Sequence, residues 1–164
     1  MTNREFEKFI YRQKDNMFRF ALSILKNNEN AEDAVQEIAL RLWKNKKSLD
    51  KLQNPDSYCL KTLKNYCLDE LRKQNHRLNY HANHQAACFN EPEVENLDMV
   101  EKIKQELDNL PTQQRMAIEL KDFLGYSYEE ISEILEMNVT AVRVNVSRGR
   151  KKLNEIFKEE LEDA

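Results

Sequence analysis

The sequence is poor in the two residues that most often interrupt helices, with two glycines and three prolines in 164 residues. Together with a charged fraction of 34%, this composition favours long helices and disfavours sheet-rich folds. A run of about eighteen apolar residues, which a membrane-spanning helix requires, is also missing. The first residues, Met1–Glu5, contain no hydrophobic stretch of a secretion signal. We therefore expect an all-α, soluble, cytoplasmic protein that does not insert into membranes.

Cysteines and the motifs of enzymes are scarce as well. Three cysteines without a CxxC spacing argue against a disulfide framework, and Cys59 and Cys67 are expected to be small buried hydrophobes. His81, His84 and Cys88 have near-ligand spacing for zinc, but no second cysteine or carboxylate pair completes four ligands, so they are interpreted as part of a solvated linker. A glycine-rich phosphate loop, an HExxH motif and recognisable paired carboxylates are all lacking. We expect no catalysis, no small-molecule substrate, and no metal or other cofactor.

A net positive charge is lacking too, although the charge is uneven along the chain. Residues 1–80 hold 16 Lys and Arg against 11 Asp and Glu, residues 81–110 hold 2 against 7, and residues 111–164 hold 8 against 11. Non-specific attraction to DNA comes from neutralising phosphates, so a chain with net charge −3 gains little of it. If this protein binds DNA, it either dimerises or is delivered by a larger partner.

What the sequence does contain is a strongly patterned basic helix, residues 138–153. One stripe at helical spacing is apolar, and the opposite face is cationic with no acidic residue in the whole segment. The stripe consists of Val142, Val146, Gly149 and Leu153. The cationic face carries Arg143, Ser147, Arg148, Arg150, Lys151 and Lys152.

A capping box precedes this helix: Ser127 starts a short helix and Glu130 stands at its third position. The short helix contains Ile131, Ile134 and Leu135, and a tight turn follows at residues 136–139. A basic amphipathic helix alone is more often a solvated surface. Preceded by a capped short helix and a tight turn, it indicates a helix-turn-helix, whose second helix enters the DNA major groove.

The N-terminal part predicts three helices. The first spans residues 4–26, and the second spans residues 31–44 with Asn30 as its cap. The second helix buries one stripe and carries a polar block on the other side, formed by Glu32, Asp33, Gln36 and Glu37. A solvated face with acids near the helix N-terminus explains this block equally well. The third helix, residues 56–75 with Pro55 in its first turn, lies in a basic zone from Lys44 to Arg77.

The rest of the chain predicts a linker and a second module. Residues 74–92 have no helical period, and an amphipathic helix with an acidic exterior begins near Glu93. A further helix starts at Pro111 and ends at Gly125, with Phe123 and Leu124 in its core stripe. We expect two small helical domains joined by a flexible linker, with boundaries at 1–75, 76–92 and 93–164.

These motifs resemble those of a known family. Residues 31–43, AEDAVQEIALRLW, look like the polymerase-clamp-binding helix of bacterial σ factors, and residues 58–73 look like their −10-element helix. Residues 110–153 resemble the σ4 domain that reads the −35 element. The σ2-like and σ4-like regions follow one another without an intervening third region, which is the layout of the extracytoplasmic-function (ECF) subgroup of the σ70 family. The expected function is therefore that of a sigma factor.

The resemblance implies partners and roles. The partners are core RNA polymerase, promoter DNA that is duplex at −35 and melted at −10, and an anti-sigma factor that occludes these surfaces. Contact with core polymerase is implied for Glu32, Asp33, Gln36 and Glu37. Contact with the −10 strand is implied for Lys46, Lys47, Asn54, Lys61, Lys64, Asn65, Asp69 and Arg72. Contact with the −35 element is implied for Ser127, Tyr128, Thr140, Arg143, Val144, Ser147, Arg148, Arg150 and Lys151.

The sequence departs from the family pattern in places. Val144 and Asn145 stand where a small polar residue and a basic residue are more usual, which favours a partly apolar −35 preference. In the third helix, Cys59, Thr62 and Cys67 replace aliphatic or aromatic residues. A different class remains open: a free-standing helix-turn-helix regulator with an N-terminal protein- or ligand-binding module. Such a regulator has no need of a polar second helix beside a basic third one.

Overall fold

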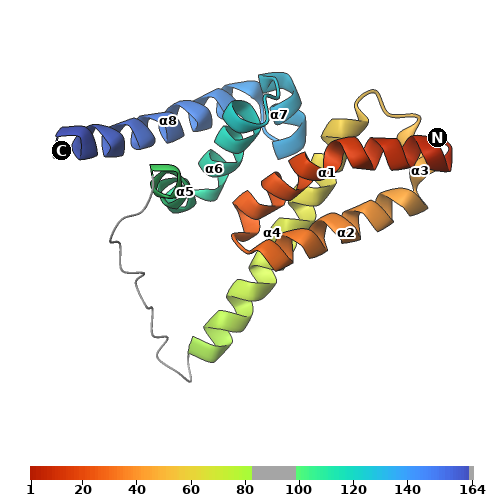
Figure 1. Ribbon diagram of the computed structural model, residues 1–164, viewed down its shortest axis with the longest axis horizontal. Coiled ribbons are helices and arrows are strands. Elements are labelled where there is room, and N and C mark those ends of the chain that lie inside the picture. Colours follow the sequence, from red (N-terminus) through yellow and green to blue (C-terminus); the bar gives the residue numbers. More distant parts are fainter. Residues whose placement is uncertain (83–98, 163–164) are drawn as a thin grey trace.

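The computed structural model describes residues 1–82 and 99–162, and these are helical with no strand among them (Figure 1). The all-α prediction is confirmed. Within these ranges every helix is too short or too polar to cross a bilayer. The N-terminal elements are α1 (Asn3–Leu25), α2 (Asn28–Lys44), α3 (Lys46–Leu49) and α4 (Pro55–Ala82). The C-terminal elements are α5 (Met99–Asn109), α6 (Thr112–Ile118), the π-helical turn η1 (Glu119–Phe123), α7 (Tyr128–Leu135) and α8 (Val139–Glu162).

Side-chain caps set where the first two helices begin. Thr2 forms a capping box with Glu5, and the backbone of Lys26 turns left-handed (φ 57°) to end α1. The side chain of Asn27 accepts a hydrogen bond from the backbone N–H of Asn30 at 2.9 Å. The predicted cap of α2, Asn30, is therefore wrong: the cap is Asn27, and the helix begins three residues earlier at Asn28.

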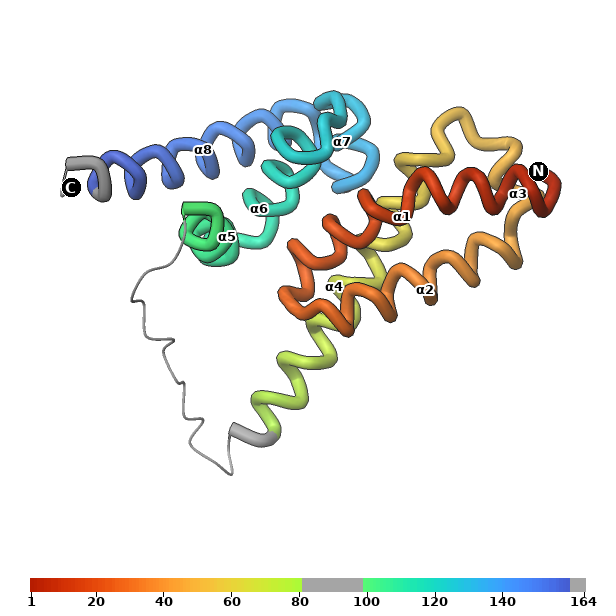
Figure 2. Tube along the Cα trace, in the orientation of Figure 1, coloured from red at the N-terminus to blue at the C-terminus, as the bar shows by residue number. Residues whose placement is uncertain are grey.

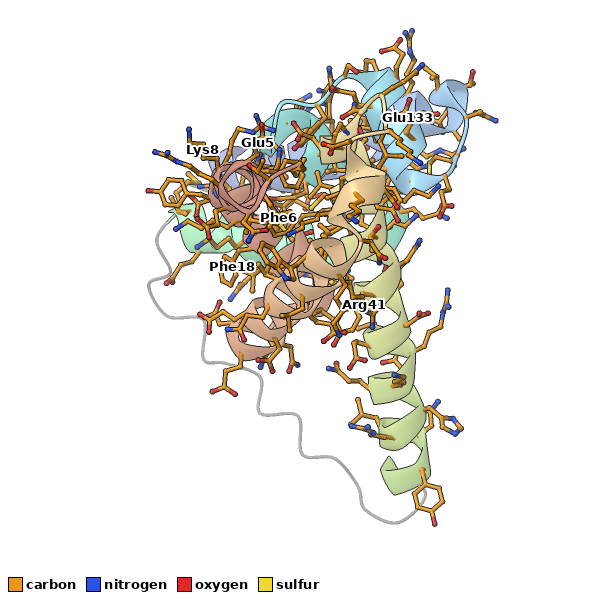
Figure 3. The ribbon with its side chains drawn as sticks, turned by 90° about the vertical axis from the view of Figure 1, so that its right-hand side faces the viewer. Glu5, Phe6, Lys8, Phe18, Arg41 and Glu133 are labelled. Carbon is orange, nitrogen blue, oxygen red and sulfur yellow. The ribbon has the colours of Figure 1, made fainter. Side chains whose placement is uncertain are left out.

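Helix α4 differs most from its prediction. Pro55 begins it as expected, but it continues to Ala82 rather than ending at residue 75. Residues 74–82 contain neither proline nor glycine, so nothing in them stops the helix. They have no apolar period because, among the described residues, no other helix packs over them: Leu78 is 65% exposed. Figure 3 shows this end of α4 projecting from the body with side chains on all sides.

The N-terminal domain is a bundle of α1, α2 and α4 around a closely packed core. Its fully buried side chains include Met17, Phe20, Ile38 and Leu60. Cys59 and Cys67 are free and buried, as predicted, and burial raises the pKa of both thiols to about 12. At neutral pH they are uncharged apolar packing groups.

The C-terminal domain contains the predicted helix-turn-helix. Ser127 and Glu130 form the capping box, and α8 packs on α6 and α7. Gly125 has a positive φ of 75° after the end of η1, as predicted. One prediction here is wrong: Phe123 is 48% exposed. The π-helical turn places an extra residue in the helix, which rotates Phe123 out of the core stripe.

The two domains are docked against each other, a placement that the sequence left open (Figures 1 and 2). Helix α6 packs against α1, and α7 packs against α4. Buried side chains of both domains form one continuous cluster, which includes Leu63 of α4 and Leu135 of α7. The domain boundaries at 1–75, 76–92 and 93–164 stay a prediction. The interpretation of the histidine and cysteine cluster as part of a solvated linker also stays a prediction, because His84 and Cys88 lie outside the described residues.

Candidate nucleic-acid and polymerase interfaces

Helix α8 presents two faces, as its sequence predicts. Val142, Val146 and Gly149 are buried against the rest of the domain, and Leu153 is half-buried. A Cβ on Gly149 would lie 2.3 Å from Cδ1 of Ile118, so a larger residue at this crossing of α8 and α6 would require the Ile118 side chain to move. The predicted −35 residues of this helix form the exposed face: Thr140, Arg143, Val144, Ser147, Arg148, Arg150 and Lys151.

Some of these −35 candidates interact with other side chains of the protein, and others do not. Arg150 donates from Nε to Asp122 at 2.9 Å, and this hydrogen bond is the main cause of the raised pKa of its guanidinium. Arg143 lies over the ring of Tyr128, with Cζ 4.9 Å from the ring centroid. Among the described residues, Arg148 and Lys151 have no hydrogen-bond or ion-pair partner.

Two predicted −35 residues at the start of α7 have structural roles. The Ser127 hydroxyl accepts the backbone N–H of Glu130 at 3.1 Å, so it is occupied as a helix cap. The Tyr128 ring holds Arg143 on α8 and also lies 4.4 Å from the Lys121 ammonium. Asn145, which departs from the family pattern, is also structural: its side chain donates to the carbonyl of Ala141 at 2.9 Å.

The predicted −10 residues lie on α3, on α4 and directly before α4, and they differ in solvent exposure and in their hydrogen bonds. Lys46 is half-buried and lies over the Trp43 ring at 3.9 Å, whereas Lys47 is exposed. Asn54 caps α4 by accepting the N–H of Ser57 at 3.1 Å. Asn65, Asp69 and Arg72 are exposed, and Arg72 pairs with Asp69 at 3.1 Å.

Lys61 and Lys64 differ from the other −10 candidates because a residue of the other domain binds them. Glu136 accepts from the Lys64 ammonium at 2.9 Å and pairs with Lys61 at 3.3 Å. The Lys64 side chain is only 5% exposed. In this docked state, Lys64 is therefore not available to a DNA strand.

One aromatic residue on the same helix was missed by the sequence reasoning. Tyr58 is 43% exposed in the first turn of α4, and its carbonyl accepts from the Thr62 hydroxyl at 2.8 Å. An exposed ring beside lysines suits base stacking. The available signal was that Tyr58 lies outside the apolar stripe containing Leu60 and Leu63, so its ring has no place in the core.

The polar block of α2 forms one surface. Glu32, Asp33 and Gln36 are exposed, and the half-buried Glu37 accepts a hydrogen bond from Arg41 at 2.8 Å. Ala34, within this segment, and Ile38, directly after it, are fully buried. The block is therefore an accessible acidic face on a helix whose other side is fixed in the core.

The seam between the domains contains buried charge. The Arg115 guanidinium is desolvated, which lowers its pKa, and it donates to the backbone carbonyl of Ser23 at 2.6 Å. Burial raises the pKa of Glu119 to about 7, with Arg19 of α1 opposing that shift. Both line a cavity of about 530 Å³ between α1, α5 and α6. Within the described residues, no group of three His, Cys, Asp or Glu side chains is placed to hold a metal ion.

The fold and these surfaces define a class: a two-domain helical protein with a helix-turn-helix and a second basic helix. The family model for Sigma-70 region 2 matches residues 10–77, and the model for Sigma-70, region 4 matches residues 101–153. The chain belongs to the σ70 family, in its ECF subgroup. It is a sigma factor that directs transcription initiation, and the free-standing regulator is not favoured.

Individual relatives agree with this assignment. The chain is 29% identical over 140 residues to the ECF RNA polymerase sigma factor EcfG of Rhodopseudomonas palustris, covering 84% of this chain and 77% of that protein. It is 27% identical over 155 residues to the ECF sigma factor SigW of Bacillus subtilis, covering 85% and 82%. The fold is similar to that of the sigma factor RpoE of Bartonella quintana, solved in complex with the anti-sigma factor NepR. That similarity has a TM-score of 0.79 at 24% identity and covers 94% of this chain and 98% of that one.

Proposed function

We propose that this sigma factor reads the −35 element as duplex DNA with α8 and captures the melted −10 element with α3 and α4. The observation that carries the first half is the exposed face of α8, opposite the largely buried apolar stripe. This face carries Arg143, Val144, Ser147 and Arg148. An arginine can bond O6 and N7 of one guanine, which gives about 1–3 kcal/mol of discrimination. The 39% exposed Val144 suits an apolar contact, such as a thymine methyl.

The second half of the proposal concerns single-stranded DNA. Bases that leave the duplex need an aromatic or apolar surface for stacking and cations for the backbone. Tyr58 offers an exposed ring, and Lys47, Asn65 and Arg72 are exposed along the same basic zone. Lys61 and Lys64 would join them once Glu136 no longer binds their ammonium groups.

Delivery by a larger partner completes the proposal. The acidic chain gains little attraction to DNA alone, so binding to core RNA polymerase through Glu32, Asp33, Gln36 and Glu37 would bring it to promoters. The protein would act in the cytoplasm as a binding subunit, without catalysis of its own. Since the similar sigma factor RpoE was solved with an anti-sigma factor, we propose that an anti-sigma protein also controls this chain.

Run-off transcription tests the function directly. Core RNA polymerase is incubated with and without the purified chain on DNA from upstream of its own gene. We expect discrete transcripts that require the chain, and their starts locate the −35 and −10 elements for mutagenesis. A footprint of the chain alone on that DNA, without any transcript, would instead identify a conventional regulator.

A further inference from the structure

The contact between α7 and α4 joins the two DNA-reading domains through one carboxylate. Glu136 stands at the end of α7 with a left-handed backbone (φ 56°), a conformation that L-residues with a side chain adopt rarely. Its two oxygens engage Lys61 at 3.3 Å and Lys64 at 2.9 Å. Hydrogen bonds from these lysines, with Lys64 first, lower the pKa of the carboxyl. A glutamate therefore occupies a helix-ending position where glycine or asparagine is usual. Its carboxylate forms ion pairs with two lysines that are candidate DNA-binding residues.

Beside the shared apolar cluster, which includes Leu63 and Leu135, the seam between the domains contains polar contacts and cavities. The Tyr126 hydroxyl meets the Asn16 amide at 3.4 Å, and the Lys26 ammonium donates to the carbonyl of Asp108 at 2.7 Å. Cavities of about 270 Å³ and 530 Å³ open between elements of the two domains. Inter-domain interfaces that mix apolar packing with polar contacts resemble transient interfaces, and relative motion of the two domains is then the default expectation.

The docked arrangement is incompatible with simultaneous −35 and −10 binding. Elements about 25 base pairs apart lie roughly 85 Å from each other along duplex DNA, at about 3.4 Å per base pair. Here α7 of the helix-turn-helix touches α4 of the −10 surface directly. The chain between Ala82 and Met99 is long enough to reach roughly 55 Å when extended, so the domains can part.

We propose that the C-terminal domain is an intramolecular inhibitor of the −10 surface, with Glu136 in the place of a DNA phosphate on Lys61 and Lys64. This proposal rests on the proposed function, because it takes both lysines as DNA contacts. Docked molecules cannot bind the −10 strand. The apparent dissociation constant is therefore the intrinsic one divided by the fraction of open molecules. Polymerase and promoter select the open state, and the free protein is kept from unproductive DNA.

The test uses the full chain without polymerase. Glu136→Gln removes the carboxylate charge, and the matched control Glu133→Gln removes the same charge from an exposed position of α7. Lysine reactivity is measured with an amine-acylating reagent and mass spectrometry. In the wild type, we expect Lys64 to react roughly tenfold or more slowly than the exposed Lys47, because its ammonium is covered. Glu136→Gln should remove most of that protection, and Glu133→Gln should leave it unchanged.

The second measurement is fluorescence anisotropy with a labelled single-stranded 12-mer of mixed sequence. Glu136→Gln should bind it roughly threefold or more tightly than Glu133→Gln, which has the same net charge. Equal affinities of the two variants, or a Lys64 that reacts as fast as Lys47 in the wild type, would overturn the inhibition. Failure of run-off transcription with these results intact would reject the proposed function and leave the intramolecular contact standing.

Discussion

Arg115 on α6 donates a hydrogen bond from Nε to the backbone carbonyl of Ser23, in the last turn of α1, at 2.6 Å. Its Nη1 donates to the carbonyls of Asp108 and Leu110, at 3.1 and 3.0 Å, where α5 ends. The last carbonyls of a helix have no partner within the helix, and its C-terminal end attracts cations. One guanidinium, 4% exposed, therefore satisfies two helix ends from different domains.

The first prediction concerns this residue. Arg115→Met should lower the free energy of unfolding by about 2–3 kcal/mol, because the carbonyls of Ser23 and Leu110 lose their charged donor. The carbonyl of Asp108 keeps a hydrogen bond from the Lys26 ammonium. Urea titration followed by circular dichroism measures it. Arg148→Met is the matched control, since Arg148 is exposed and has no protein partner among the described residues. An equal, small loss in both variants would show that water replaces the guanidinium at these carbonyls.

The second prediction concerns the crossing of α8 and α6. Helix propensity alone says that Gly149→Ala should stabilise the protein by about 1 kcal/mol. The new Cβ would lie 2.3 Å from Cδ1 of the buried Ile118, so we expect a net loss of about 1–2 kcal/mol instead. Adding Ile118→Val removes that Cδ1 and should recover most of the loss in the double variant. Thermal unfolding of the wild type, both single variants and the double variant measures these changes. If Gly149→Ala alone stabilised the protein, the Ile118 side chain would be able to change rotamer at little cost.

Most of the fold could be predicted from the sequence because its signals are local. The capping box at Ser127 and Glu130 and the stripe of α8 each lie within a few turns of one helix, and the structure has both. Where signals compete locally, prediction failed: Asn27 and Asn30 are both good caps, and only the hydrogen bond distinguishes them. The end of α4 failed because an exposed helix has no apolar period to read.

The docking of the domains could not be predicted, because its contacts join distant parts of the chain. Nothing around Lys64 in the sequence indicates that Glu136 binds it, and nothing around Arg115 indicates Ser23. Phe123 likewise faces solvent because of a π-helical turn that has no sequence signature. The candidate DNA surfaces could be named residue by residue, whereas their availability depends on a tertiary arrangement.

The third prediction concerns pH. Burial raises the pKa of Glu119 from 4.5 to about 7, so between these values the folded protein holds a proton that the unfolded chain has lost. The contribution of Glu119 to the free energy of unfolding is fully present below pH 4.5 and is lost as the pH rises through about 7. Charged groups facing the same cavity are Arg19, Lys26, Lys104, Asp108 and Arg115.

Glu119→Gln should therefore remove a pH-dependent part of the stability, roughly 1–2 kcal/mol once partial solvent exposure is allowed for. Urea unfolding at pH 5 and pH 8 measures the difference in the wild type and in the variant. The exposed Glu133→Gln serves as the control, because a solvated carboxylate makes no such contribution. If the free energy of unfolding had the same pH dependence in the wild type and in Glu119→Gln, the Glu119 carboxylate would be solvated and not buried.

The fourth prediction concerns the acidic face of α2. Asp33→Lys with Glu37→Lys should weaken binding to core RNA polymerase, because the changes reverse charge on the proposed contact surface. Neither carboxylate is in the core, so circular dichroism should show an unchanged fold. Co-purification with tagged core enzyme is the measurement. The charge-matched control is Glu129→Lys with Glu133→Lys on α7, and equal retention of both double variants would make the α2 face a solvated surface only.

The last prediction separates base reading from phosphate binding on α8. Arg148 is exposed and unpaired among the described residues, whereas the Arg150 guanidinium is engaged by Asp122. Arg148→Ala should weaken promoter binding by about 1–3 kcal/mol and relax the preference at one −35 position. Arg148→Lys keeps the charge but loses the planar pair of donors, so it should restore affinity for scrambled −35 DNA without restoring the preference. Binding of polymerase carrying each variant to intact and scrambled −35 elements measures both effects. If Arg148→Ala loses equal affinity on both DNAs, Arg148 contacts only the phosphate backbone, and Arg143 becomes the remaining arginine for base readout.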